Sequence, residues 1–267
     1  MNDSPRVPLV AWGPDRPSEL DAYFKLWART DAGPASYWHS GFVHALLAGR
    51  KLVPLLRYSG LFRVFVEPRE RAYRATIADA VMFSDAAGTP QARSDKFRNP
   101  VTGRSVPVRH FFEGPYTIEA TESSEHLVVH SGPAPVIPFR PRRWQLLGSQ
   151  VVVSRDIYGS TDGIGASAPP TGATVQPMTL ATFSAPLEQL RDSRRSGLSS
   201  TILSQQFVGP WMPWLDMSEQ AGAAVSCGTG QKLEPDLSDL PAAARARLSR
   251  VHPSILRSVE HWNEAHR

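Results

Sequence analysis

Hydrophobic and polar positions alternate along most of the chain between residues 37 and 207, and a period of two is typical of half-buried β-strands. The predicted strands cover residues 37–47, 51–66, 72–84, 106–112, 116–121, 125–130, 144–158, 175–184 and 199–207. Short turns rich in Gly, Pro, Asn and Asp separate most of them, without βαβ alternation or an internal repeat. The pattern therefore predicts a mainly β protein whose antiparallel sheet forms a closed or nearly closed β-barrel.

Helical spacing of hydrophobic residues is confined to the two ends of the chain. Residues 18–21, Ser-Glu-Leu-Asp, resemble a capping box, and hydrophobic residues at helical spacing follow, which predicts a helix over about residues 18–30. Short helices are predicted again over about residues 239–265, with an interruption at His252-Pro253. We therefore expect a single β-barrel domain over residues 1–267 with short helices near both termini.

The predicted strand 51–66 has two unlike faces. One face is almost purely apolar, whereas the other mixes apolar residues with Arg57 and Arg63. An apolar face that carries arginines suits the inside of a barrel that holds an anionic ligand. The alternative is that both arginines lie at a barrel rim, with their charged ends in water.

The segment 208–217 is unusually rich in aromatic residues. It holds Trp211 and Trp214 together with two methionines, two prolines and Asp216. A rigid aromatic segment of this kind suits the wall of a small-molecule pocket, and it suits a core-packing loop as well. Asp216 is accordingly either a catalytic acid or base, or a residue that stabilises a turn.

Composition argues against several classes of protein. The formal net charge is only +4 at a sequence pI near 9.4, and no long basic arm is present, so nucleic-acid binding is not expected. Cys227 is the only cysteine, which precludes an internal disulfide and leaves no need for an oxidising compartment. No apolar run reaches the roughly 20 residues of a membrane span. We expect a cytoplasmic protein without a membrane partner.

Known cofactor motifs are incomplete. Residues 159–165, Gly-Ser-Thr-Asp-Gly-Ile-Gly, look like the glycine-rich turn of short-chain dehydrogenases, but the Ala-Ser-Ala-Pro-Pro that follows cannot start the required helix. Residues 160–172 are instead predicted to form a mobile loop, and whether it acts as a lid is left open. Metal-ligand spacings, a hydrolase nucleophile elbow and a phosphate-binding loop are absent. No cofactor and no metal are predicted.

The remaining candidates for chemistry are polar and aromatic side chains on apolar strands. Histidine titrates nearest neutrality, and each such side chain alone is equally consistent with a structural residue whose hydrogen bonds are satisfied. The candidate catalytic residues are His39, His110, Tyr116, Asp156 and Asp216. The candidate substrate-binding residues are Trp38, Arg57, Arg63, Tyr158, Trp211 and Trp214.

Five segments of the chain together carry a resemblance to a protein family. They are the tryptophan-glycine strand at 37–43, the Asn-Pro-x-Thr-Gly turn within 97–106, the Trp-x-Pro-Trp segment at 211–217, the Gly-x-Lys at 230–232 and the closing helix at 237–253. Together they resemble the bacterial and fungal domain-of-unknown-function family 1838, except that Ser218-Glu219 stands where the family tends to have Gly-Asp. The resemblance implies a barrel similar to lipocalins or allene oxide cyclase, but no reaction and no catalytic residues.

The sequence thus favours a cofactor-independent enzyme of the lyase or isomerase type. The reaction would be a decarboxylation, cyclisation or elimination on a hydrophobic, aromatic carboxylate or phenol, with Arg57 or Arg63 holding the anion. The expected partner is accordingly a small hydrophobic or aromatic anion. A non-catalytic binding or carrier barrel is the alternative, and a pocketless subunit of a larger assembly is a third hypothesis. Self-association into a homo-oligomer is left open.

Overall fold

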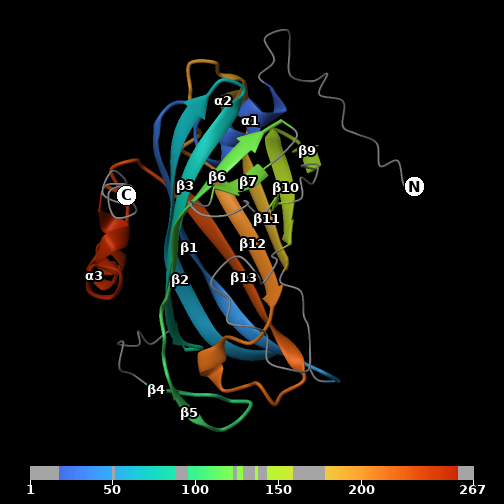
Figure 1. The fold of residues 1–267 in the computed structure, drawn as a ribbon, viewed down its shortest axis with the longest axis vertical. Helices are drawn as coiled ribbons and strands as arrows, with labels where there is room; N and C mark the ends of the chain where they lie inside the picture. Colours follow the sequence, from blue (N-terminus) through green and yellow to red (C-terminus); the bar gives the residue numbers. More distant parts are fainter. Residues whose placement is uncertain are drawn as a thin grey trace.

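The structure is a computed structural model that describes residues 18–49, 52–87, 96–122, 125–128, 136–137, 143–158 and 178–257. Eleven strands form one antiparallel sheet in the order β8-β7-β6-β3-β2-β1-β13-β12-β11-β10-β9 (Figure 1). These strands are β1 (Gly33–Leu47), β2 (Val53–Arg69), β3 (Ala72–Asp85), β6 (Phe111–Thr121), β7 (Glu125–Val128), β8 (Val136–Ile137), β9 (Arg143–Leu147), β10 (Gln150–Tyr158), β11 (Met178–Pro186), β12 (Ile202–Gly209) and β13 (Gly222–Leu233). The predicted mainly β, antiparallel fold is confirmed.

Further elements lie outside this sheet. A separate hairpin consists of β4 (Lys96–Arg98) and β5 (Ser105–Pro107). The helices are α1 (Glu19–Trp27), α2 (Leu187–Arg191) and α3 (Ala242–Val251), with the 3₁₀ turns η2 (Pro213–Leu215) and η3 (Pro253–Leu256). Within the described part of the chain the edge strands β8 and β9 are not paired with each other, so closure of the barrel stays a prediction.

Helix α1 lies on the concave side of the sheet, at one end (Figure 1). It begins where Ser18 Oγ accepts a hydrogen bond from the Asp21 N–H at 3.0 Å. Its aromatic residues reach strands from both halves of the sheet: Phe24 stacks on Tyr73 of β3 at 4.1 Å, and Tyr23 meets Phe183 of β11 at 6.4 Å between ring centroids. Because one helix contacts both halves, the sheet must curve around it.

A second hydrophobic cluster fills the opposite end of the concave side. Trp211, Leu215 and Met217 pack there with Phe97 of the β4–β5 hairpin and Phe83 of β3. Trp211 also donates its indole N–H to the carbonyl of Gln220 at 2.8 Å. The two clusters leave a stretch of concave face between them, in the middle of the long strands β1, β2 and β3.

The convex side of the sheet is covered by the C-terminal elements. Leu248 of α3 and Ile255 of η3 belong to a third hydrophobic cluster, together with Leu61 of β2 and Met82 of β3. Arg63 lies in the same region, only 5 % exposed, and donates to the carbonyls of Ile255 and Arg257 at 2.8 and 2.7 Å. The mixed arginine face of β2 is therefore the convex face, and its apolar residues are explained by the helix that covers them.

The structure corrects the predicted elements at several points. The predicted strand 144–158 is the hairpin β9–β10, which turns at Gly148-Ser149, and α2 adds a short helix in the middle of the chain. Strand β13 was not predicted, because three glycines and a cysteine obscure its period of two. It is nevertheless central, pairing with both β1 and β12. The predicted loop 160–172 lies outside the described residues.

Candidate functional site

The strand register brings polar side chains together in the middle of the concave face, between the two hydrophobic clusters. Side chains alternate between the two faces of a strand, so residues that are paired across strands share a face. His39 of β1 lies opposite Gly60, Asp79 of β3 lies opposite Phe62, and Tyr58 of β2 lies opposite Gly41. The seven members of this group, called here the concave polar layer, are His39, Tyr58, Asp79, Glu113, Tyr116, Arg155 and Gln205.

A β-bulge in β6 completes the concave polar layer. Tyr116 pairs with Ile77 and Glu113 pairs with Asp79, so two residues of β6 lie opposite the single residue Ala78. In a regular strand, residues three apart point to opposite faces. The bulge cancels this alternation and turns both Glu113 and Tyr116 toward the concave side. It also sets Glu113 directly across from Asp79.

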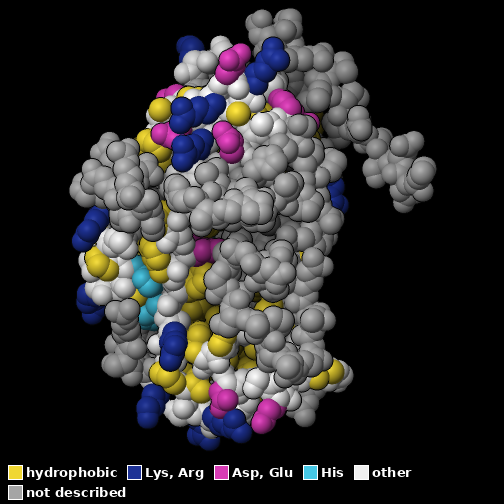
Figure 2. All heavy atoms as spheres, in the orientation of Figure 1, with side chains coloured by type: hydrophobic (Ala, Val, Ile, Leu, Met, Phe, Trp, Pro, Cys, Tyr) yellow, Lys and Arg dark blue, Asp and Glu magenta, His cyan; other side chains and the backbone are white. Residues whose placement is uncertain are grey.

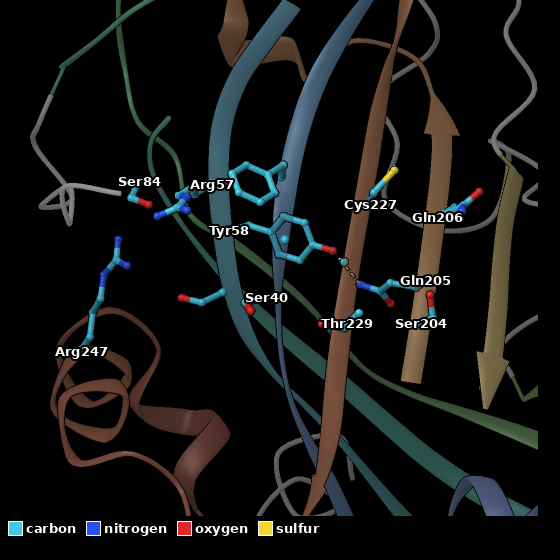
Figure 3. A pocket seen from close by; sticks show the side chains of 14 residues that line it. Ser40, Arg57, Tyr58, Ser84, Ser204, Gln205, Gln206, Cys227, Thr229 and Arg247 are labelled. Carbon is cyan, nitrogen blue, oxygen red and sulfur yellow. Dashed lines mark hydrogen bonds between the residues drawn. The ribbon is translucent and has the colours of Figure 1, made fainter. Parts of the chain in front are cut away.

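Hydrogen bonds connect four members of the concave polar layer: His39, Asp79, Gln205 and Tyr58. His39 Nε2 lies 2.9 Å from Asp79 Oδ1, and Gln205 Nε2 lies 3.4 Å from His39 Nδ1. The same amide nitrogen donates to the Tyr58 hydroxyl at 3.2 Å, the contact drawn in Figure 3. An amide nitrogen only donates, so Nδ1 accepts and Nε2 carries the proton that points at Asp79. Asp79 is thereby held as an acceptor, and the Tyr58 proton remains available for donation.

Glycines provide the space in which these two rings lie. A Cβ added to Gly60 would come within 2.5 Å of His39 Nε2, and one added to Gly228 would collide with the Tyr58 hydroxyl. The His39 side chain is only 2 % exposed, whereas that of Asp79 is 24 % exposed. Of this pair Asp79 is the group that a small molecule can reach, and His39 is placed to position it.

Burial raises the pKa values of three members of the layer: Glu113, Tyr116 and Tyr58. Burial, and secondarily the charge of Asp79, raises the pKa of Glu113 from 4.5 to about 7. Burial also raises the pKa of Tyr116 and that of Tyr58, so both phenols keep their protons at neutral pH. One face therefore combines a carboxylate acceptor, a carboxyl group that changes its protonation near neutrality, and two phenolic donors.

The concave polar layer also contains a cation and has apolar neighbours. Arg155 of β10 donates to the Tyr23 hydroxyl at 3.0 Å, and its positive charge also acts on Tyr116. Strand pairing places the apolar residues Val81 and Phe111 beside Asp79 and Glu113. Figure 2 shows hydrophobic side chains and an acidic one in a hollow near the middle of the molecule. The layer can thus meet a molecule that is partly apolar and partly anionic.

Two of the predicted catalytic residues, His39 and Tyr116, lie in the concave polar layer. His110 does not: its Nδ1 accepts the Phe83 N–H at 3.1 Å, where β3 runs beyond its pairing with β6. Asp156 projects from the convex face and pairs with Arg143 at 2.5 Å. Asp216 has left-handed backbone angles and pairs with Arg104 at 2.8 Å, outside the layer.

The predicted substrate-binding residues do not come together. Trp38, Arg57 and Arg63 occupy the convex face, which overturns the expectation that the two arginines line the concave side. Trp211 and Trp214 pack in the hydrophobic cluster at one end of the sheet, and Trp214 meets Phe83 at 5.6 Å. The side chain of Tyr158 lies outside the described residues.

Five members of the concave polar layer were not predicted: Tyr58, Asp79, Glu113, Arg155 and Gln205. Tyr58 lies on the almost purely apolar face of the predicted strand 51–66, which gives it no sign of a chemical role, and Arg155 lies on the opposite face of its strand from the candidate Asp156. Asp79 offers a signal in the sequence, since it is an isolated carboxylate inside the largely apolar run 75–83. Glu113 offered none, because its face depends on the bulge.

Two features are absent from the described residues, namely a metal-binding cluster and a helix that could cross a membrane. No group of three or more His, Cys, Asp or Glu side chains in them is arranged to hold a metal ion. Among the helices in the described ranges, none has the length and apolar character needed to cross a membrane.

Comparison with known proteins identifies a family over part of the chain. Residues 170–266 match the family model described as "Protein of unknown function (DUF1838)", which confirms the predicted family resemblance. No curated protein matches the chain. Among solved structures, the crystal structure of Rv2717c from M. tuberculosis aligns with 82 % of this chain and 100 % of its own, at 10 % identity and a TM-score of 0.27. A structural similarity this low supports no assignment.

Proposed function

We propose that this protein is an enzyme of the lyase or isomerase type that transfers protons with its own side chains. The proposal rests on one observation, namely that Asp79 and Glu113 face each other on adjacent strands in unlike environments. His39 holds Asp79 as a hydrogen-bond acceptor, whereas burial favours a proton on Glu113. Two carboxyl groups whose environments differ in this way are suited to act as base and acid in one reaction.

Each member of the concave polar layer has a defined role in this proposal. Asp79 removes a proton from a carbon or hydroxyl group of the substrate, and Glu113 donates a proton to the oxygen on which negative charge develops. Tyr116, in the row of side chains next to Glu113, donates a hydrogen bond to the same oxygen, and Tyr58, beside His39, donates one to a polar group in another part of the substrate. His39 and Gln205 are positioning residues, because they act through Asp79 and Tyr58.

The surroundings support a small aromatic or hydrophobic substrate with an anionic group. Arg155 is the candidate to bind that anion, in place of Arg57 and Arg63. The apolar residues beside the carboxyl pair would contact the hydrocarbon part of the substrate. The proposed reaction is a decarboxylation, a cyclisation or an elimination. The proposal also includes closure of the sheet into a barrel around the concave polar layer.

The test is a search for proton transfer on defined probes. Arylpyruvates and hydroxycinnamates would be incubated with the protein in D₂O, and carbon-bound deuterium and released CO₂ would be measured. We expect turnover of at least one probe, and a fall of about 100-fold or more in Asp79→Asn and in Glu113→Gln. The exposed Glu119 on the same strand provides the matched control, and Glu119→Gln should retain full activity. Turnover that survives Asp79→Asn would contradict the proposed mechanism.

A non-catalytic carrier is the second candidate, because one observation favours it. His39 is almost completely buried and both of its ring nitrogens have partners, which is common for a structural polar network. A carrier would bind the same probes without any deuterium incorporation or CO₂ release. Its affinity, measured by calorimetry, would fall in Arg155→Gln and would change little in Asp79→Asn.

A further inference from the structure

The convex side of the sheet carries a groove whose arginines and hydroxyl groups the proposed function does not use. It has a volume of about 680 Å³ and lies between α3 and strands β12, β13, β1 and β2 (Figure 3). Besides Tyr58 and Gln205 of the concave polar layer, its polar lining residues come from five strands and one helix: Ser40, Arg57, Ser59, Ser84, Ser204, Gln206, Thr229 and Arg247. The lining residues include two arginines and no carboxylate.

The strand register arranges these side chains in two parallel rows. Ser204 pairs with Thr229, Thr229 with Ser40, and Ser40 with Ser59, which gives four hydroxyls side by side across four strands. Adjacent strands are about 4.8 Å apart, so neighbouring hydroxyls can contact a single bound group. Each hydroxyl can both donate and accept, which suits a polar ligand.

The second row contributes positive charge. It runs from Gln206 through Cys227 and Phe42 to Arg57 and Ser84. Arg57 is exposed, its guanidinium lies 4.8 Å from the centre of the Phe42 ring, and it makes no ion pair with the described residues. A guanidinium with open donor positions beside a row of hydroxyls is the arrangement that binds carboxylate and phosphate groups.

Helix α3 brings the second arginine to the same place. Arg247 donates to the carbonyl of Phe83 at 2.6 Å, and Phe83 immediately precedes Ser84. In Figure 3 the side chains of Arg57, Ser84 and Arg247 lie at the same end of the groove. Two guanidinium groups on different elements therefore border one hydroxyl-rich surface.

We propose that this groove is a binding site for a small oxyanion, a phosphate or carboxylate group attached to a polar molecule. Arg57 and Arg247 bind the anion, and the hydroxyl row binds the polar remainder. The two arginines and the hydroxyl row lie on the other face of the sheet from Asp79 and Glu113, and only Tyr58 and Gln205 of the concave polar layer also border the groove. Either proposal can therefore fail without the other.

The only cysteine of the chain provides a reporter for this site. Cys227 is exposed and lines the groove, so its rate of modification depends on what occupies the groove. Two reagents would be compared, the dianionic Ellman's reagent and the neutral N-ethylmaleimide. Inorganic phosphate or benzoate would be added, and potassium chloride at equal ionic strength would serve as the control. We expect phosphate, benzoate or both to slow the two reagents in a saturable manner, and the effective anion identifies the class of ligand.

Variants then assign the effect to the arginines. Arg57→Gln changes an exposed side chain and should leave folding intact, yet it should slow Ellman's reagent about fivefold while N-ethylmaleimide is unaffected. The additional change Arg247→Gln should abolish protection by the anion. Arg98→Gln removes an exposed arginine of the β4–β5 hairpin and is the control that should behave as wild type. Absence of protection by either anion, or equal protection in Arg57→Gln, would overturn the proposal.

Discussion

Replacing Glu113 by Gln should stabilise the protein at alkaline pH and leave it unchanged at acidic pH. The pKa of Glu113 is raised to about 7 from the ordinary 4.5, so its ionisation costs about 3 kcal/mol more in the folded protein than in the unfolded chain. Glu113 is half-buried, and solvent screening lowers the expected effect to about 2 kcal/mol. Because the folded pKa is raised, the contribution of the neutral carboxyl is complete below pH 4.5 and is lost as the pH rises through 7.

The assay is urea unfolding followed by tryptophan fluorescence at about pH 4 and about pH 8, compared between wild type and Glu113→Gln. Other titrating groups affect both proteins alike, so the difference in unfolding free energy isolates Glu113. Glu119→Gln changes an exposed carboxyl on the same strand and should show no such pH-dependent gain. If the difference between wild type and Glu113→Gln is the same at both pH values, Glu113 is not held in a buried site next to Asp79, and the acid proposed for catalysis is wrong.

Three further substitutions test other parts of the structure. Gly60→Ala places a methyl group 2.5 Å from His39 Nε2 and should lower the unfolding free energy by about 1–3 kcal/mol. It should also abolish the signal of the hydrogen-bonded imidazole N–H in proton NMR, and an unchanged signal would show that the His39 ring is not confined. Arg63→Met removes two hydrogen bonds to the η3 region and should cost about 2–4 kcal/mol in urea unfolding and speed proteolysis near the C-terminus, whereas equal proteolysis would mean that this arginine does not anchor η3. Asp216→Asn should lower the unfolding free energy by about 1 kcal/mol or less, because its ion pair with Arg104 is exposed and Asn tolerates left-handed backbone angles; a larger loss would reveal a contact beyond that pair.

The long strands could be predicted because each has at least one face against a hydrophobic core. Strands β1, β2 and β3 alternate over many residues, and the capping box at Ser18 identifies the start of a helix. Strand β13 could not be found in this way. Its glycines are required by their neighbours rather than by strand propensity, since a Cβ on Gly228 would collide with the Tyr58 hydroxyl. A local pattern carries no information about a ring supplied from another strand.

The sequence also could not show which face of β2 lies on the concave side of the sheet. Period two separates Arg57 and Arg63 from Tyr58 and Phe62, but it does not say which set is concave. Both faces of β2 are largely apolar, because α1 covers one and α3 with η3 covers the other. With two apolar faces, an arginine is as compatible with a helix-covered convex face as with a ligand cavity. Only the packing of the terminal helices decides between them.

The candidate site depends on a single irregularity of the backbone. Without the bulge opposite Ala78, a regular strand that kept Tyr116 on the concave face would point Glu113 to the convex one. Asp79 would then have no second carboxyl opposite it, and the group whose pKa is raised to about 7 would be absent from this face. A bulge costs local hydrogen bonding, and such features are over-represented beside active sites because they re-aim a side chain. The bulge in β6 has that effect here: it brings an acid into register with the carboxylate that His39 positions, and this geometry supports a site for proton transfer more strongly than any motif in the sequence does.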